Sequence, residues 1–525
     1  GSDAIGGVVN FVLKRNFDGL QLRAQDGISS RGDGNAWFVS GTAGKNFADD
    51  RGNVALSVEY AKQEDIYYSD RRQTRSRGGF VIVDSDPAGS ANGSDGIPDR
   101  IFVSDIHSML ISEGGTFQPS CTGGNPLTCR PDGRARLFRF QSDGSIREAD
   151  YGVDFRPLAN SSAGGDGSTL RRYGQLQPQT QRLAVNLIGH FDVNRAFRPY
   201  VEAKYVRNKV FQQSSPSFDQ PLLLNSGDQI SLDNPFLSAE TRAFIAARLP
   251  AGATTFRLNR NNLDLGVREE SIRRETYRAV VGAEGDLGDA WRYDVSATYG
   301  EFKKRSLSRN NRVEQRYAYA LDAVRSPTGQ IVCRVTVDPS ARVPYADSLA
   351  SYVAGDVAAC VPLNPFGEGA PSDAAKAYVN TTSRADGKQT QTVLSGSISG
   401  DTSPWFSLPA GPIGLAAGAE YRRETAHEQY DDLVRAGGTF LNAIPIFDPP
   451  AFSVKEAFAE IRVPVLADLP WAKELSVNGA VRGADYSGAT GKVLAYNAGV
   501  IYAPIRDVRF RANYSKSVRA PLLSE

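Results

Sequence analysis

The chain has 525 residues and an almost balanced charge, Lys+Arg 60 against Asp+Glu 59, which argues against nucleic-acid binding through a basic stripe. It contains no run of about 18 apolar residues, so a membrane-spanning helix is excluded. A membrane β-barrel is not excluded, because its strands need only about 9 to 11 alternating residues. Abundant Gly, Tyr and Phe predict an all-β fold.

The first element is a glycine turn, Gly6-Gly7, followed by an apolar strand from Val8 to Leu13. Two glycines permit a tight turn, and branched and aromatic residues favour a buried strand. Such a pair also precedes strands in unrelated globular proteins. The whole run resembles the end of the plug domain of TonB-dependent outer-membrane receptors, where it leads the chain from plug to barrel. The resemblance rests on Gly1, Ser2, Asp3, Ala4, Gly6, Gly7 and Asn10.

Beyond this start, apolar and polar residues alternate in many segments. In residues 291–300, Trp, Tyr, Val, Ala and Tyr share one face, while Arg, Asp, Ser, Thr and Gly share the other. A period of two is the mark of a β-strand. We predict about thirteen strands on this basis, at residues 18–27, 35–45, 52–63, 179–191, 197–211, 274–284, 290–304, 390–401, 412–426, 453–464, 473–486, 493–503 and 507–516.

The connections between these strands are alternately short and mostly long. The long ones, at residues 64–178, 212–273, 305–389 and 427–452, read as extended polar segments rich in Gly, Ser, Asp, Asn and Pro. Consecutive antiparallel strands place alternate connections at opposite ends of a sheet, and outer-membrane barrels have short periplasmic turns and long extracellular loops. A soluble sandwich also alternates, but it gives no reason for this parity. The sequence therefore predicts a transmembrane antiparallel β-barrel in the cell outer membrane.

Four cysteines form two local pairs inside the long connections, Cys121 with Cys129 and Cys333 with Cys360. We expect two loop disulfides, which persist in an oxidising compartment such as the periplasm or the cell surface. A zinc site built from all four lacks the close Cys-x-x-Cys spacing.

Two further segments, Leu408–Arg423 and Arg511–Pro521, resemble barrel strands of the same receptor family. The resemblance implies a barrel of about 22 strands around a plug. We therefore expect residues 1–15 to be the end of the plug and 16–525 to be part of the barrel. An unpaired last strand in lipid would leave backbone groups unsatisfied, so we expect more strands, and a signal peptide, outside this chain.

Candidate sites for chemistry are few. His107, His190 and His427 are scattered, and no nucleophile elbow or phosphate loop occurs, so we expect no enzyme. A loop with Asp84, Asp86, Asp95 and Asp99 resembles extracellular calcium repeats, with an insertion between its acidic pairs. Solvated acidic turns of this composition are commoner than calcium sites. We expect no other cofactor.

Basic and mixed polar rows offer contacts to partners. The run Arg71–Arg77 could hold a lipopolysaccharide phosphate, or it is a solvated loop. A second set faces the predicted lumen and is expected to pair internally and with the plug: Arg292, Asp294, Glu420, Arg422, Arg482, Arg509 and Arg511.

The family resemblance implies energy-coupled uptake of a scarce nutrient such as a ferric siderophore, cobalamin or an oligosaccharide. The implied partners are outer-membrane lipid and the periplasmic TonB protein, which would act on a segment upstream of this chain. The alternatives are a passive porin or adhesin barrel and a secreted soluble β-rich carbohydrate-binding protein.

Overall fold

The fold is dominated by one long antiparallel sheet. The computed structural model describes residues 13–82, 85–154, 161–219, 228–342, 354–440, 443–519 and 523. The sheet has 13 strands in chain order: β1 (Gly19–Gly27), β2 (Ala36–Phe47), β3 (Gly52–Gln63), β14 (Gln179–Phe191), β15 (Arg198–Gln213), β19 (Glu269–Leu287), β20 (Trp291–Arg312), β23 (Asn380–Asp401), β24 (Gly414–Tyr430), β25 (Phe452–Leu469), β26 (Ala472–Tyr486), β27 (Gly491–Ile505) and β28 (Val508–Lys516). All the predicted strands are thus confirmed.

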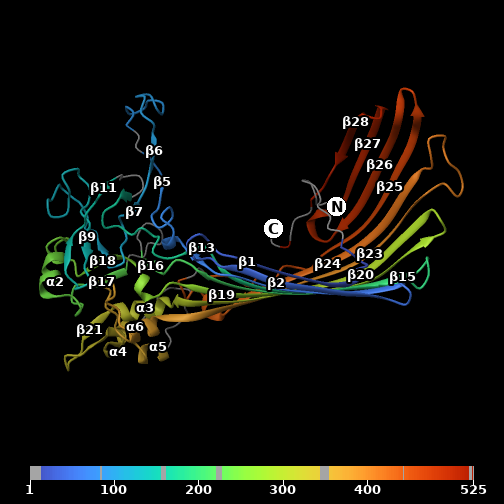
Figure 1. Ribbon diagram of the computed structural model, residues 1–525. Coiled ribbons are helices and arrows are strands. Elements are labelled where there is room, and N and C mark those ends of the chain that lie inside the picture. The colour runs from blue at the N-terminus through green and yellow to red at the C-terminus, as the bar shows by residue number, and fades with distance from the viewer. Residues whose placement is uncertain are drawn as a thin grey trace.

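The sheet bends into an open trough, with the loop elements gathered at one end and the short turns at the other (Figure 1). Strands β1 and β28 are its two edges within the described residues. The segment that carries Gly1, Ser2, Asp3, Ala4, Gly6, Gly7 and Asn10 lies outside the described residues.

Several strands extend further into the loop end than the sequence predicts. Strand β19 begins at Glu269 instead of residue 274, β20 continues to Arg312 instead of 304, and β23 begins at Asn380 instead of 390. In these extensions both faces carry polar residues, so the alternation of apolar residues disappears while backbone pairing continues. The pair Glu269–Arg309, for example, is in register across β19 and β20.

The long connections are not extended polar segments, as the sequence suggested, but contain folded elements. Residues 64–178 form β4 (Ile66–Tyr67), η1 (Tyr68–Asp70), β5 (Gly79–Ile82), β6 (Arg100–Val103), β7 (Ile106–Ser108), β8 (Thr116–Phe117), β9 (Phe138–Phe140), β10 (Ile146–Glu148), β11 (Val153–Asp154), β12 (Ser161–Ala163) and β13 (Gln175–Gln177). Residues 214–268 form β16 (Phe218–Asp219), β17 (Asp228–Ser231), α2 (Ala239–Ala246), β18 (Thr255–Asn261) and η2 (Leu263–Leu265).

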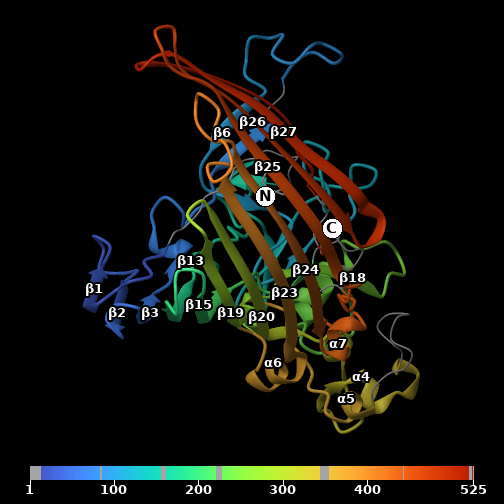
Figure 2. The same cartoon turned by 90° about the vertical axis from the view of Figure 1, so that its right-hand side faces the viewer.

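The later connections are mostly helical. They form α3 (Glu314–Leu321), β21 (Ala323–Arg325), β22 (Ile331–Cys333), α4 (Arg334–Val337), η3 (Pro339–Ala341), α5 (Ala354–Ala358), α6 (Asp373–Val379), α7 (Asp432–Arg435) and η4 (Gly488–Thr490). Side-chain caps start some of these helices: Ser238 accepts a bond from the N–H of Thr241 at α2, and Ser372 accepts one from Ala375 at α6. Figure 2 shows the helices α4, α5, α6 and α7 together at one end of the strands.

The largest buried core lies in the loops, not in the sheet. Elements from residues 64–178, 214–268 and 313–379, which we call the loop domain, pack on a shared cluster. Its members include Phe117, Phe138, Ile230, Ile245, Phe256, Leu258, Tyr317, Leu321, Leu363 and Phe366. Single apolar residues among turn residues give no period, which is why the sequence did not reveal this core.

Candidate functional site

The two faces of the sheet differ in chemistry. One face, which we call the outward face, exposes apolar side chains such as Val281 (63% exposed), Val295 and Leu394. Aromatic residues stand at both ends of this apolar band: Trp405 and Trp471 at the short turns, and Tyr277 and Tyr299 toward the loops. Exposed apolar bands flanked by aromatic girdles are the surfaces that face lipid in outer-membrane barrels.

The opposite face, which we call the polar face, carries a network of paired side chains. Arg278 bonds Glu202 at 3.0 Å, and Arg292 bonds Glu284 at 2.9 Å. The hydroxyl of Tyr200 donates to Asp294 at 3.2 Å. The Tyr200 ring fits beside Gly282 because glycine has no Cβ, which would collide with the ring there.

Most of the residues predicted to face the lumen join this network. Arg482 donates through Nε to Glu456 at 3.0 Å, and Arg509 bonds Glu474 at 2.8 Å. Arg422 lies 3.7 Å from Glu424. Arg511 stands in β28, two residues beyond Arg509. Arg422, Arg482 and Arg509 thus have carboxylate partners within the sheet: on the same strand for Arg422, on the adjacent strand for Arg482, and two strands away for Arg509.

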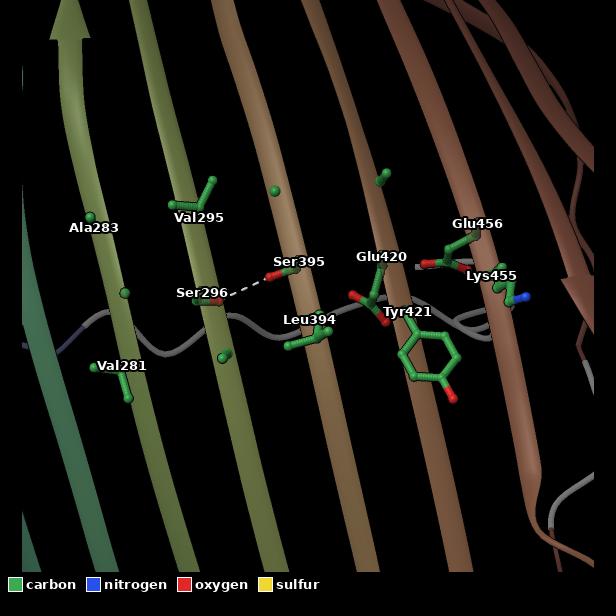
Figure 3. A pocket seen from close by; sticks show the side chains of 14 residues that line it. Val281, Ala283, Val295, Ser296, Leu394, Ser395, Glu420, Tyr421, Lys455 and Glu456 are labelled. Atoms are coloured by element: carbon green, nitrogen blue, oxygen red, sulfur yellow. Dashed lines mark hydrogen bonds between the residues drawn. The ribbon is translucent and has the colours of Figure 1, made fainter.

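One polar row crosses four strands at a shallow depression of about 780 Å³. Ser296 and Ser395 share a hydrogen bond of 2.9 Å, and register continues the row to Glu420 and then Glu456. Figure 3 shows these four side chains on successive strands β20, β23, β24 and β25. The row presents hydroxyl and carboxylate oxygens, which suit a polar or hydrated surface.

The short segment before β1 lies against the polar face. Arg15 bonds Glu284 at 2.8 Å, and its guanidinium lies 5.3 Å from the ring centre of Tyr200. The carbonyl of Phe17 accepts a bond of 2.9 Å from Asn53. We call residues 13–17 the strap. It lines a cavity of about 460 Å³ together with β1, β2, β3, β14, β15 and β19.

A buried ionic network centred on Arg312, the last residue of β20, joins the loop domain to the sheet. Its Nη1 bonds both carboxylate oxygens of Asp219 at 2.9 Å, and its Nη2 bonds Glu314 at 3.0 Å. Tyr317 and Asn262 also donate to Asp219, each at 2.9 Å. Because Arg312 and Asp219 are almost fully buried, their charges require this complete set of partners.

A second buried arginine, Arg260, links two connections of the loop domain. It bonds both oxygens of Asp264, at 2.8 and 2.6 Å. It also donates to the carbonyls of Pro365 at 3.0 Å and Gly367 at 3.1 Å. The bonds join residues 214–268 to residues 313–379 and fix their relative position.

Both cysteine pairs are disulfide-bonded in the structure. The sulfur atoms lie 2.06 Å apart in Cys121–Cys129 and 2.10 Å apart in Cys333–Cys360. Cys333 is buried and packs with Cys360 beside Tyr319. This second bridge crosses 27 residues and ties β22 to the segment after α5.

The acidic residues of the calcium candidate mostly bond their own loop. Asp84 lies outside the described residues. Asp86 accepts bonds from the N–H groups of Gly93 and Asp95 at 2.6 and 2.9 Å, and Asp95 accepts one from Ser85. Asp99 accepts one from Gly93 at 3.2 Å. Among the described residues, no group of three or more metal-binding side chains is assembled, so the calcium site stays a prediction.

The other singled-out residues lie apart. His107 contacts Asp105 and His427 contacts Asp448, while His190 belongs to β14. In the basic run, Arg71 makes a bidentate bond to Asp33, at 2.5 and 2.7 Å. The Arg71–Asp33 pair attaches the first long connection to the β1–β2 turn. The guanidinium–carboxylate bonds hold the pKa of Asp33 well below its ordinary value.

Sequence reasoning missed the strap contact, the two ionic networks and the loop core. Arg15 directly follows a recognised motif, but its partner Glu284 lies in a distant strand, so no local signal joins them. Within the described residues, no helix has the length and apolar character required to cross a membrane.

A comparison with protein families agrees with this architecture. Residues 211–525 match the family model described as "TonB dependent receptor-like, beta-barrel". No curated protein matches the chain significantly.

The solved structures that match this chain include siderophore receptor PirA from Acinetobacter baumannii, with a TM-score of 0.41 and 10% identity over 97% of this chain and 44% of that one. The ferric-catecholate import receptor Fiu from E. coli K12 gives 0.39 and 11%, over 96% and 51%. BauA, the ferric preacinetobactin receptor from Acinetobacter baumannii, gives 0.27 and 10%, over 97% and 63%. The chain thus spans between 44% and 63% of the chains it matches.

Proposed function

Because the chain belongs to the TonB-dependent receptor-like β-barrel family, we propose that it forms the outer-membrane wall and outer vestibule of a receptor for energy-coupled nutrient uptake. The substrate class is a small nutrient such as a ferric siderophore, cobalamin or an oligosaccharide. The energy comes from TonB, acting on the part of the protein that precedes the barrel.

The observation that carries this proposal is the division of the sheet into an outward apolar face and a polar face that holds the strap. Lipid covers the first face, and substrate passes along the second. The loop domain stands at the outer end and is fixed by its own core and buried ion pairs. It therefore provides a rigid vestibule, whose apolar core is formed within the loops and which Arg312 joins to the end of β20.

The strap has the properties of a releasable attachment. Arg15 is about half exposed, and its bond to Glu284 is one ion pair. The strap adds to this pair only the ring contact with Tyr200 and the bond from Asn53 to the carbonyl of Phe17. These contacts are few beside the paired strands of the sheet, so a pull on the upstream chain detaches the strap without unfolding the sheet. Detachment opens the cavity of about 460 Å³ between the strap and the wall.

Uptake by cells tests the proposal. Cells with the complete gene and cells with the gene deleted are compared for uptake of labelled ferric siderophores, cobalamin and oligosaccharides. We expect gene-dependent uptake of one class, abolished by a protonophore and by loss of TonB. Gene-dependent entry that persists without membrane energy would identify a passive porin and would contradict the proposal.

A further inference from the structure

Three cations stand directly opposite one another on the outward face. Lys209 of β15 is in register with Arg273 of β19, and Arg273 is in register with Arg305 of β20. Like charges at directly opposed positions destabilise a pair of strands. We call these three residues the cation row.

In a neighbouring row, a carboxylate of the sheet itself neutralises two directly opposed cations. Lys303 and Lys388 are also directly opposed, but Glu301 bonds both of them, at 2.7 and 3.0 Å. In the cation row, Arg273 bonds Glu275 and Arg305 bonds Asp386. Within the described residues, the Lys209 side chain has no hydrogen bond or ion pair, and no carboxylate bridges it to Arg273.

The cation row lines a hollow on the outer surface of the sheet. The hollow has a volume of about 420 Å³, and Phe211 and Leu307 contribute apolar wall beside the three cations. Arg273 and Arg305 are more than half exposed. Each guanidinium has five N–H donors, so donors remain after its one carboxylate contact.

The hollow stands just beyond the outer end of the apolar band. From Leu287 to Tyr277, β19 advances about ten residues, roughly 33 Å, and a strand tilted by about 40° therefore rises about 25 Å. This rise equals the height of the apolar band of outer-membrane barrels. The ring of Tyr277 lies 5.0 Å from that of Tyr205, as in an interface girdle. Arg273 lies about four residues further, roughly 10 Å higher, at the level of lipid headgroups.

We propose that the cation row binds the phosphate group of a phosphorylated lipid in the outer leaflet. The site rests on the proposed membrane position of the sheet. Arginine forks bind phosphate oxygens in pairs and a lysine ammonium adds a point charge. The bound phosphate supplies an anion to Lys209 and to the guanidinium donors that Glu275 and Asp386 leave free, while the tyrosine girdle and apolar band hold the acyl chains. A freely diffusing phosphate contacts the cations but has no acyl chains to contact the girdle and the apolar band.

Native mass spectrometry of the full-length protein in detergent tests the site. The probe is bisphosphorylated lipid A, compared with lipid A lacking both phosphates and with inorganic phosphate. The variant is the triple substitution Lys209→Gln, Arg273→Gln and Arg305→Gln. Its control is Lys45→Gln, Arg195→Gln and Arg506→Gln, which removes the same charge from exposed cations at the short-turn end.

We expect the wild type and the control to retain bisphosphorylated lipid A about tenfold more strongly than the variant. Dephosphorylated lipid A should bind all three proteins equally and weakly. Equal retention of bisphosphorylated lipid A by variant and control would overturn the site. So would equal binding of the two lipids, which indicates acyl contact alone, or full competition by millimolar inorganic phosphate, which indicates a site for the free ion.

Membrane insertion of the same proteins separates this result from the proposed function. If all three fold in detergent and insert into outer membranes, lost selectivity for phosphate refutes the cation row alone. If the wild type does not insert, the proposed function fails as well.

Discussion

The loop domain buries its apolar side chains, whereas the sheet exposes apolar side chains on its outward face. In the loop domain, Phe117 and Leu363 are inside and the core is closed from solvent. In the sheet, apolar residues such as Val281 point away from the polar face and remain exposed. The loop domain is packed as a water-soluble protein is packed, whereas in the proposed function lipid covers the outward face of the sheet. Apolar side chains are therefore buried in the loop domain and exposed on the outward face of the sheet, and the change occurs at the level of the tyrosine girdle.

The two regions also treat charge differently, and breaking the central ion pair of the loop domain should have the largest effect. Asp219→Ala leaves the guanidinium of Arg312 buried without its main partner. We expect a loss of about 3–5 kcal/mol in loop-domain stability, measured by proteolytic susceptibility of the loops in denaturant. The control is Asp289→Ala, since Asp289 is 93% exposed in its pair with Arg195 and such pairs contribute about 0–1 kcal/mol. Equal effects would contradict the buried network.

Removal of the longer disulfide should be the next strongest change. For a closed loop of 27 residues, the chain-entropy estimate is about 3.5 kcal/mol. The bridge Cys121–Cys129 closes only 8 residues, for about 2.5 kcal/mol. We therefore expect the double serine variant of Cys333 and Cys360 to lower the unfolding midpoint of the loop domain more than the corresponding variant of Cys121 and Cys129. The reverse order would contradict the loop-length account.

A charge placed on the outward face should disturb the sheet and leave the loop domain unchanged. Val281→Arg puts a guanidinium in the apolar band, at an expected cost of about 2–4 kcal/mol near the bilayer centre. The control is Ser296→Arg, on the polar face, where water is available. Refolding into lipid vesicles across a denaturant series measures the free energy of unfolding of both variants. An unchanged stability for Val281→Arg would show that this face is not in lipid.

The smallest expected effect is the pH response of the Arg71–Asp33 attachment. Bonds from Arg71 and Ser29 lower the pKa of Asp33 below its ordinary value of 3.8. A carboxyl with a lowered pKa in the folded state contributes stability above its unfolded pKa, and loses it as pH falls through the folded one. The attachment is therefore complete at neutral pH and weakens below about pH 4.

Hydrogen exchange of the turn at residues 71–75, corrected for its intrinsic pH dependence, measures this response. Asp33→Asn should show the weakened protection at every pH. An acid response that persists in Asp33→Asn would assign the effect to another carboxyl.

The sheet could be predicted from the sequence because its signal is local. Each strand alternates by itself, and the parity of the connections orders the strands. The loop domain could not be predicted in this way, because Asp219 and Arg312 are separated by 93 residues and neither belongs to a recognisable motif. The cation row was hidden for a related reason. Arg273 and Arg305 lie in strand extensions without apolar alternation, Lys209 lies near the end of its strand, and only the register brings the three together.

Cysteine labelling on intact cells tests the division between the loop domain, the outward face and the short turns most directly. Single cysteines are placed in the full-length protein at Ser94 in the loops, Val281 on the outward face and Asp289 in a short turn, and treated with a membrane-impermeant maleimide. We predict labelling of Ser94→Cys on intact cells, labelling of Asp289→Cys only after the outer membrane is permeabilised, and protection of Val281→Cys until the protein is unfolded. Labelling of Asp289→Cys on intact cells, or of Val281→Cys in the folded protein, would contradict the account.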